Sequence, residues 1–361
     1  AQASDKSGVN KVVFSLNGVA QQTNNVPPYL FSWLVPYQGV TTETIAATAY
    51  DNAGNSAASS IQVVSQGALI TNILQTVTQQ SANQPVSPGD WTVAIWGGPP
   101  VTIATSGNNY ETPATFYLRT PNTATPAPFA GDSLQIDSGG TLYLKNGGQT
   151  SGNAATVNLL LNGGTINFHG GFAPNGPALA GTLQVLVNSA ITTDQTGVNA
   201  ADIWVQSPIS GGGNLTVNLN STTNALLLSG NNAGFSGNWT NASTYGSIKI
   251  LSGTTSPLGS GSVMLLNPGT GLVFNSSNNL AFNNPINGAG SVTQQNTNIV
   301  TLNGSNTFAG PLQISAGVLQ LGVNASVGGA TTIDLSSGAT LNVAAVAGGF
   351  ATGISQTLNG E

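Results

Sequence analysis

Side chains able to carry acid–base chemistry are scarce in this sequence. The 361 residues include eleven Asp and Glu, five Lys and Arg, and one His. Cleavage of a glycosidic bond requires a paired acid and base, but the candidates are scattered: Asp132, Asp137, Asp194, Asp202, Asp334, Arg119 and His169. Asp132 and Asp137 flank one short apolar strand in turn sequences, where Asp commonly bonds to its own backbone. We therefore expect no catalytic residues and no enzyme.

Metal and cofactor sites are not expected either. His169 has no second histidine with which to form a zinc site. Calcium binds carboxylate and carbonyl oxygens in loops, so Asp5 and Asp51 are the remaining calcium candidates. The sequence contains neither an Asp-x-Asp-x-Asp spacing nor a Gly-Gly-x-Gly-x-Asp nonapeptide. The prediction is therefore no metal site and no cofactor.

Aromatic side chains offer a different chemistry, because their faces stack on sugars and neighbouring amides bond to hydroxyls. Trp204, Trp239 and Tyr245 are the glycan-contact candidates, in a set that also includes Trp91, Trp96, Tyr110 and Tyr117. The alternative is packing in the core or at strand edges, and we favour it for most of the set.

Charge and hydropathy exclude two classes of partner. Only 4% of residues are charged and the net charge is −6, so no basic stripe exists to neutralise a nucleic-acid backbone. No apolar run reaches the roughly 18 residues that a membrane-spanning helix needs. The sequence also lacks cysteine, which is compatible with a secreted bacterial protein. We expect neither nucleic-acid binding nor a membrane span.

The segment 1–65 contains short strand patterns separated by turns. Residues 9–16 alternate in polarity and lead into Asn17-Gly18, a dipeptide typical of a two-residue hairpin. The segments 5–18, 28–33 and 47–55 resemble the pattern of bacterial Ig-like domains. This resemblance implies an Ig-like β-sandwich over residues 1–65 that lacks its first strands. Its missing edge would be supplied by a neighbouring subunit or by the same, longer polypeptide.

Residues 66–88 are expected to connect two domains. Apolar residues between Ala68 and Gln79 recur at helical spacing, which predicts a short helix covering one end of the next domain. Thr71, Thr76 and Thr78 are poor helix formers. An extended linker is therefore the open alternative.

Residues 89–361 repeat one design, in which four to six alternating residues are followed by Gly, Asn or Pro. The segment 208–215 recurs at 285–292, so the offset between the two copies is 285 − 208 = 77. Such self-similarity is typical of a solenoid. Asn-rich turns are expected to form hydrogen-bonded ladders between its successive turns.

The segment 300–322 closely resembles the passenger-associated repeat of bacterial autotransporter-like proteins, with the pattern clearest at 208–266 and 285–340. The resemblance implies a right-handed parallel β-helix at the cell surface or outside the cell. The last residues look like the start of a further turn, so we expect a piece of something longer.

The resulting expectation is an all-β, structural or adhesive extracellular protein. The β-helix would be a stiff rod, and the incomplete Ig-like domain would join subunits into a filament by β-strand addition. Its partners would be copies of itself or neighbouring domains, and glycans in the alternative of a glycan-binding module. A polysaccharide-degrading β-helix enzyme is the remote alternative.

Overall fold

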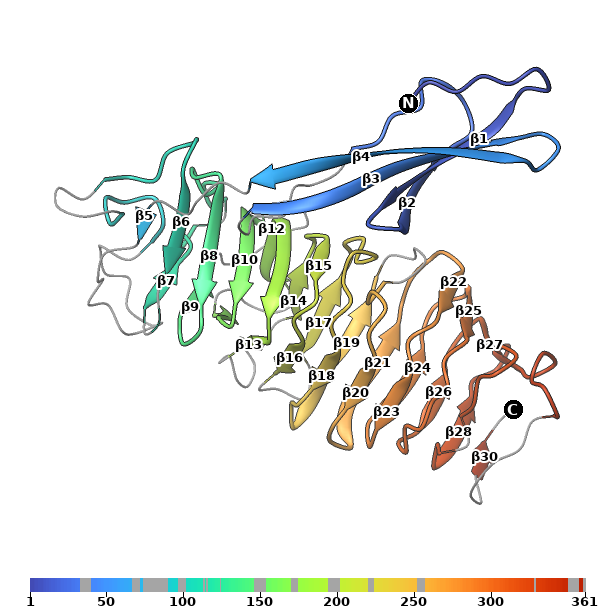
Figure 1. The fold of residues 1–361 in the computed structure, drawn as a ribbon. Coiled ribbons are helices and arrows are strands. Elements are labelled where there is room, and N and C mark those ends of the chain that lie inside the picture. The colour runs from blue at the N-terminus through green and yellow to red at the C-terminus, as the bar shows by residue number, and fades with distance from the viewer. Residues whose placement is uncertain are drawn as a thin grey trace. The chain divides into compact units, whose positions relative to one another are not determined.

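The computed structural model shows an all-β chain (Figure 1). It describes residues 1–32, 40–66, 72–73, 90–96, 102–112, 114, 116–123, 125–145, 154–169, 175–193, 202–219, 224–251, 257–327, 329–349 and 357–359. The chain divides into two compact units, Ala1–Ile70 and Thr71–Glu361. Within the described residues no helix is long and apolar enough to span a membrane.

The first unit is a four-stranded antiparallel sheet in the order β2-β1-β3-β4. Its strands are β1 (Val9–Leu16), β2 (Val19–Asn24), β3 (Val40–Asp51) and β4 (Ser56–Gln66). The predicted hairpin joins β1 to β2, with φ values of 49° at Asn17 and 82° at Gly18, as a type I′ turn requires. The sheet is compatible with a partial Ig-like domain. Trp33 of the Ig-like pattern lies outside the described residues.

One face of this sheet is partly covered. Val12 and Phe14 point to the same side of β1 and are buried with Tyr29. The ring of Phe31 stacks on that of Phe14 with centroids 5.4 Å apart. This core is small for a sheet in which one strand, β3, is 12 residues long.

The second unit is a parallel β-solenoid, as predicted. Its longest sheet contains fourteen strands, which Figure 1 shows side by side along the unit. These are β5 (Asn72–Ile73), β6 (Asn109–Thr112), β8 (Ser133–Asp137), β10 (Ala155–Asn162), β12 (Asn175–Val187), β14 (Asp202–Val205), β15 (Ile209–Gly211), β17 (Ala225–Leu228), β19 (Tyr245–Ile250), β21 (Gly269–Phe274), β24 (Ser291–Gln294), β26 (Leu312–Ile314), β28 (Thr332–Leu335) and β30 (Thr357–Asn359).

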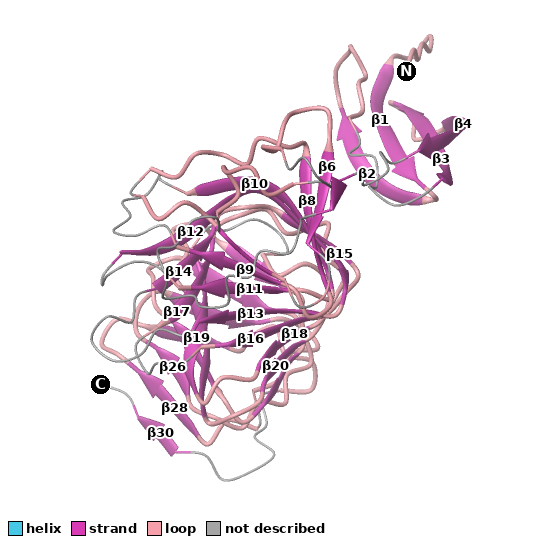
Figure 2. Ribbon diagram, turned by 90° about the vertical axis from the view of Figure 1, so that its left-hand side faces the viewer, coloured by secondary structure: helices cyan, strands magenta, loops and turns pink. Residues whose placement is uncertain are grey.

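Two further sheets complete the solenoid. The eight-stranded sheet, whose stacking is clear in Figure 2, consists of β7 (Tyr117–Arg119), β9 (Thr141–Leu144), β11 (Thr165–Phe168), β13 (Ser189–Thr193), β16 (Leu215–Asn218), β18 (Trp239–Asn241), β20 (Val263–Leu265) and β23 (Ile286–Gly288). The four-stranded sheet consists of β22 (Leu280–Phe282), β25 (Ile299–Leu302), β27 (Val318–Leu321) and β29 (Thr340–Asn342). The right-handed winding stays a prediction.

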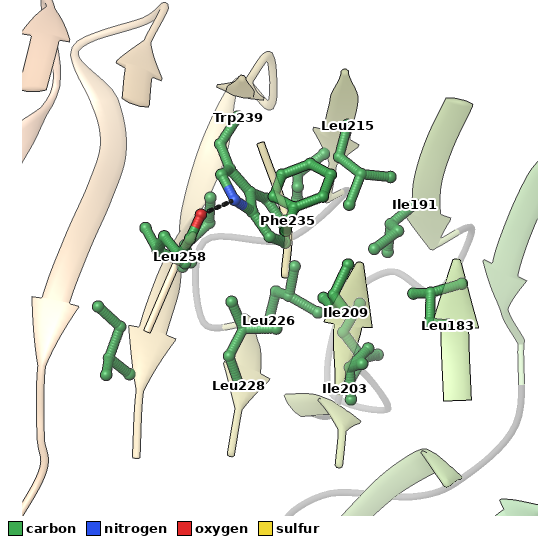
Figure 3. Packing of buried hydrophobic residues seen from close by; sticks show 14 of the residues in the cluster. Leu183, Ile191, Ile203, Ile209, Leu215, Leu226, Leu228, Phe235, Trp239 and Leu258 are labelled. Carbon is green, nitrogen blue, oxygen red and sulfur yellow. Dashed lines mark hydrogen bonds between the residues drawn. The ribbon is translucent and has the colours of Figure 1, made fainter. Parts of the chain in front are cut away.

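Alternation along each strand sends apolar side chains into the interior. Leu134, Leu159 and Leu183 are paired in register on successive turns and are fully buried. Such ladders form one continuous core along the solenoid (Figure 3). Because the apolar residues of each turn pack on those of the next, no single turn has a complete core of its own.

The turns of the solenoid are shorter than the interval between the two copies of the repeated segment in the sequence. The paired residues Leu134, Leu159 and Leu183 give turn lengths of 159 − 134 = 25 and 183 − 159 = 24. Further along, the pairing of Val292 with Leu312 gives a shorter turn of 312 − 292 = 20. The recurrence of segment 208–215 at 285–292 therefore spans about three turns.

Glycines allow a close approach of successive turns at the repeated motif. Gly211 and Gly288 hold corresponding places in the two copies, and both have φ of +102°. A Cβ atom there would lie 2.2 Å from the Val185 carbonyl oxygen or 2.1 Å from that of Leu265. Since both positions combine left-handed backbone with contact to a carbonyl, only glycine fits.

The predicted asparagine ladders are present. The side chain of Asn188 accepts a hydrogen bond from Asn214 N, that of Asn214 from Asn238 N, and that of Asn238 from Ser262 N, at 3.1, 2.8 and 2.8 Å. Buried Asn232 accepts from Ile209 N at 2.8 Å and donates to Pro257 O at 2.6 Å. Each such amide links neighbouring turns without using a charge.

Aromatic residues fill the first described turns. Trp91, Trp96, Tyr110 and Phe129 are buried with ring centroids 4.8–5.7 Å apart. The stretch for which the sequence left a helix or an extended linker open is described only at Asn72–Ile73, which form β5 beside β6. A helix is thus wrong at these two residues, and the rest of 67–89 lies outside the described residues.

Candidate functional site

The outer edge of β4 is a candidate interaction surface. All 11 residues of β4 pair with β3 without a register shift, and no described strand pairs with its other side. Native edge strands are usually protected by charged residues, proline or a bulge. The sequence of β4, SAASSIQVVSQ, contains neither a charge nor proline. Its free backbone groups are therefore suited to pairing with another strand.

A row of apolar residues crosses the same sheet. Val19, Leu16, Ile45 and Ile61 are paired in register from β2 to β4, on the face that carries Phe14. Val19 and Ile61, at the two ends of the row, are 63% and 62% exposed. The cluster around Tyr29 covers Val12 and Phe14. An apolar part of the sheet face thus remains in contact with solvent.

The opposite edge of the sheet is partly occupied. On β2, the side-chain amides of Gln22 and Asn24 both donate to Leu30 O, at 2.9 and 2.7 Å. The segment that follows β2 is thereby held against it. Of the two edges, that of β4 is the more accessible to a new strand.

The calcium candidates Asp5 and Asp51 stabilise turns. Asp51 accepts the backbone N–H groups of Ala53 and Asn55 at 2.8 Å and the Asn55 amide at 2.7 Å, and the Asn55 side chain is the main cause of its lowered pKa. Asp5 accepts Ser7 N at 2.6 Å. Both line a cavity of about 160 Å³, but no group of three metal-ligating side chains occurs in the described residues.

The three glycan-contact candidates differ in how far they are exposed to solvent. Trp239 is wholly buried against Phe235 and donates its indole N–H to Leu258 O at 3.0 Å (Figure 3), so its proposed contact with a glycan is wrong. Inward alternation on β18 places it in the core. Trp204 is partly buried and donates to Ser229 Oγ at 2.8 Å. Tyr245 is 50% exposed, and its ring packs over Gly269.

The predicted carboxylates in the described residues accept hydrogen bonds within the chain, and two of them, Asp132 and Asp202, bond to backbone. Asp132 accepts Gly107 N and Asp202 accepts Ala225 N, each at 2.8 Å and on a neighbouring turn. Burial is the main cause of the raised pKa of Asp202. Asp334 accepts the hydroxyl of Thr332 at 3.3 Å. Asp194 lies outside the described residues.

Sequence reasoning missed one carboxyl pair, Glu111 and Asp137. A hydrogen bond that the protonated Glu111 carboxyl donates to the Asp137 carboxylate raises the pKa of Glu111 to about 7, with burial and charge repulsion adding to the shift. Asp137 also accepts the amides of Gln135 and Asn162 at 2.9 and 2.8 Å. Glu111 pairs in register with Gln135 on the next turn, and Asp137 stands two positions beyond Gln135 on the same strand. Knowing the length of a turn would have revealed the pair.

Arg119 and His169, the other two polar candidates, lie on one outer face of the eight-stranded sheet. Arg119 ends β7, and His169 follows β11. The ring of Tyr143 on β9 lies between these strands and contacts the His169 ring.

In comparisons with known proteins, no family model matches the chain, and neither a curated protein nor a solved structure is significantly similar to it.

Proposed function

We propose that this protein is a structural, adhesive component of an assembly at the cell surface or outside the cell. In this role the β-solenoid is a stiff rod, and the sheet β1–β4 is a joint completed by a β-strand from a neighbouring subunit. The observation that carries the proposal is the unprotected edge of β4, which lacks the devices that normally prevent strand addition.

Two further features support this role. The apolar row ending at Val19 and Ile61 would be covered by residues of an added strand or by the segment that brings it. The solenoid is joined from turn to turn by uncharged asparagine amides, which salt does not screen. A rod held in this way suits an environment of variable ionic strength.

Strand addition is tested with the double variant Ile61→Lys/Val64→Lys. The two side chains lie on opposite faces of β4 and are 62% and 63% exposed, so folding should tolerate them. Electron microscopy of the wild type should show filaments built from chains of this mass, and the variant should give dispersed rods, because charges on an edge strand oppose pairing.

Val323→Lys is the matched control, because Val323 is 59% exposed in the solenoid. It should leave filaments intact. Dispersed wild-type rods, or filaments that persist in the double variant, would contradict the proposal. Intact-mass measurement of native material distinguishes a polymerising subunit from a heavier single chain that completes its sheet in cis.

We further propose that the protein is not an enzyme. Asp132 and Asp202 bond to backbone on neighbouring turns, and Asp137 of the pair with Glu111 is engaged by two amides. Incubation with polygalacturonate should release no new reducing ends. Release that is lost in Glu111→Gln would instead make the pair a catalytic acid and base.

A further inference from the structure

Three rings lie in a diagonal row across neighbouring strands of the eight-stranded sheet. Tyr117, Tyr143 and His169 are contributed by β7, β9 and the residue after β11; we call them the tyrosine–histidine row. The centroids of Tyr117 and Tyr143 are 6.0 Å apart, and those of Tyr143 and His169 are 6.1 Å apart. The sequence interval is the same in both steps, since 143 − 117 equals 169 − 143.

Register explains the diagonal. Tyr117 pairs with Thr141, and Tyr143 pairs with Asn167, so each ring stands two positions further along its strand than the ring before. A step of two keeps the side chains on one face. The residues between them, such as Leu118, Leu142 and Phe168, are fully buried. The row therefore points away from the core.

The row is accessible to a ligand along its length. Tyr117 is 36% exposed, and Tyr143 and His169 are partly exposed. Ring faces held by a rigid sheet need little ordering on binding. The hydroxyls of Tyr117 and Tyr143 add hydrogen-bonding groups at the ends of the rings.

Two basic residues lie near Tyr143, one in register and one in sequence. Arg119 pairs in register with Tyr143, and Lys145 directly follows β9. The chain has five Lys and Arg and one His in all, so two of the five and the sole histidine lie on or directly after three neighbouring strands. Asp90 pairs with Arg119 from the preceding turn, and its carboxylate accepts Thr92 N at 2.8 Å. The outward positions of β7, β9 and β11 carry no acid.

We infer that the tyrosine–histidine row is a binding site for a polysaccharide that contains uronic acids. The rings stack on the apolar faces of successive sugars, and Arg119 attracts their carboxylates. Lys145, which is 8% exposed, adds to the local positive charge from within the sheet surface. This site does not depend on the sheet β1–β4. Of the aromatic residues singled out in the sequence, it includes only Tyr117.

Affinity electrophoresis of the full chain in gels that contain polygalacturonate tests this site. Dextran serves as the neutral sugar polymer and poly-glutamate as the polyanion without sugars. We expect retardation by polygalacturonate alone. Equal retardation by poly-glutamate would overturn the role of the rings, and equal retardation by dextran would overturn the role of the charge.

Substitutions locate the site. Tyr117→Ala and Tyr143→Ala should each weaken binding about five- to tenfold, as expected for loss of one aromatic contact, and Arg119→Gln should do the same for polygalacturonate. Lys249→Gln is the matched control elsewhere on the solenoid and should leave binding unchanged. Tyr143→Phe retains the ring and loses only the hydroxyl, so it should keep most of the binding even where Tyr143→Ala melts too early to be assayed.

Unchanged binding in Tyr117→Ala, which removes the most exposed ring and leaves the core untouched, would overturn the inference. So would the absence of any retardation of the wild type by polygalacturonate.

Discussion

Gly211 and Gly288 of the repeated motif are required both for their left-handed backbone and for their lack of a Cβ atom. We predict that Gly288→Ala lowers the free energy of unfolding by at least about 2 kcal/mol, since it combines left-handed strain with a clash against Leu265 O. Gly212→Ala is the control, because its Cβ would approach no atom closer than Ser236 Oγ at 3.5 Å. Urea denaturation followed by circular dichroism checks both. Equal midpoints would contradict this explanation of the repeat.

The pair of Glu111 and Asp137 makes stability depend on pH. The pKa of Glu111 is about 7 in the folded chain against an ordinary 4.5. The folded state therefore binds more protons than the unfolded state between these values. The stabilisation is complete below pH 4.5 and is lost as the pH rises through 7.

Glu111→Gln should abolish the loss of stability at high pH, since a glutamine amide can donate a hydrogen bond to Asp137 at any pH. We expect the variant to have the same melting temperature as the wild type near pH 4.5 and to melt about 2–4 °C higher at pH 8. This shift corresponds to a contribution of about 1 kcal/mol to the free energy of unfolding, because the pair is partly exposed and screened by solvent. Thermal melts at several pH values measure the difference. In an Asp137→Asn background the difference should vanish, and its persistence there would assign the effect to another group.

Buried asparagines connect one element to the next. Asn306 repeats the role of Asn232, accepting from Ile286 N at 3.0 Å and donating to Ser326 O at 3.1 Å. We predict that Asn306→Ala destabilises the solenoid by about 2–3 kcal/mol, because it leaves buried backbone groups unpaired. Asn231→Ala, at an exposed turn, should cost less than about 1 kcal/mol. Similar losses in the two variants would argue against the ladder.

The elements themselves were largely predictable. Alternation in segments such as 133–137 and 141–144 correctly indicated short strands with one buried face. It was harder to predict whether a given aromatic side chain points into the core or toward solvent. Trp239 and Tyr245 occur in similar polar sequences, and only the strand register shows that Trp239 points inward. Contacts across turns, such as Glu111 with Asp137, could not be predicted without the length of each turn, which strand pairing defines.

At the scale of the whole molecule, the two units have separate cores. That of the first unit centres on Val12, Phe14 and Tyr29, while that of the second extends from Trp91 to Ile333. We predict that calorimetry resolves two transitions, and that a fragment of residues 71–361 keeps the main one within about 2 °C. A single transition that is lost in the fragment would mean that the units fold as one.

The scarcity of charge has a consequence for digestion. Proteases that cleave after Lys or Arg have three sites in residues 71–361, namely Arg119, Lys145 and Lys249. Arg119 ends β7, Lys249 lies within β19, and Lys145 is nearly buried after β9. Such enzymes cut exposed, mobile loops, and the loops of this solenoid contain almost no residue that they recognise. A trypsin-rich environment would therefore cut the first unit at Lys6, which lies in an exposed turn, and leave the solenoid intact.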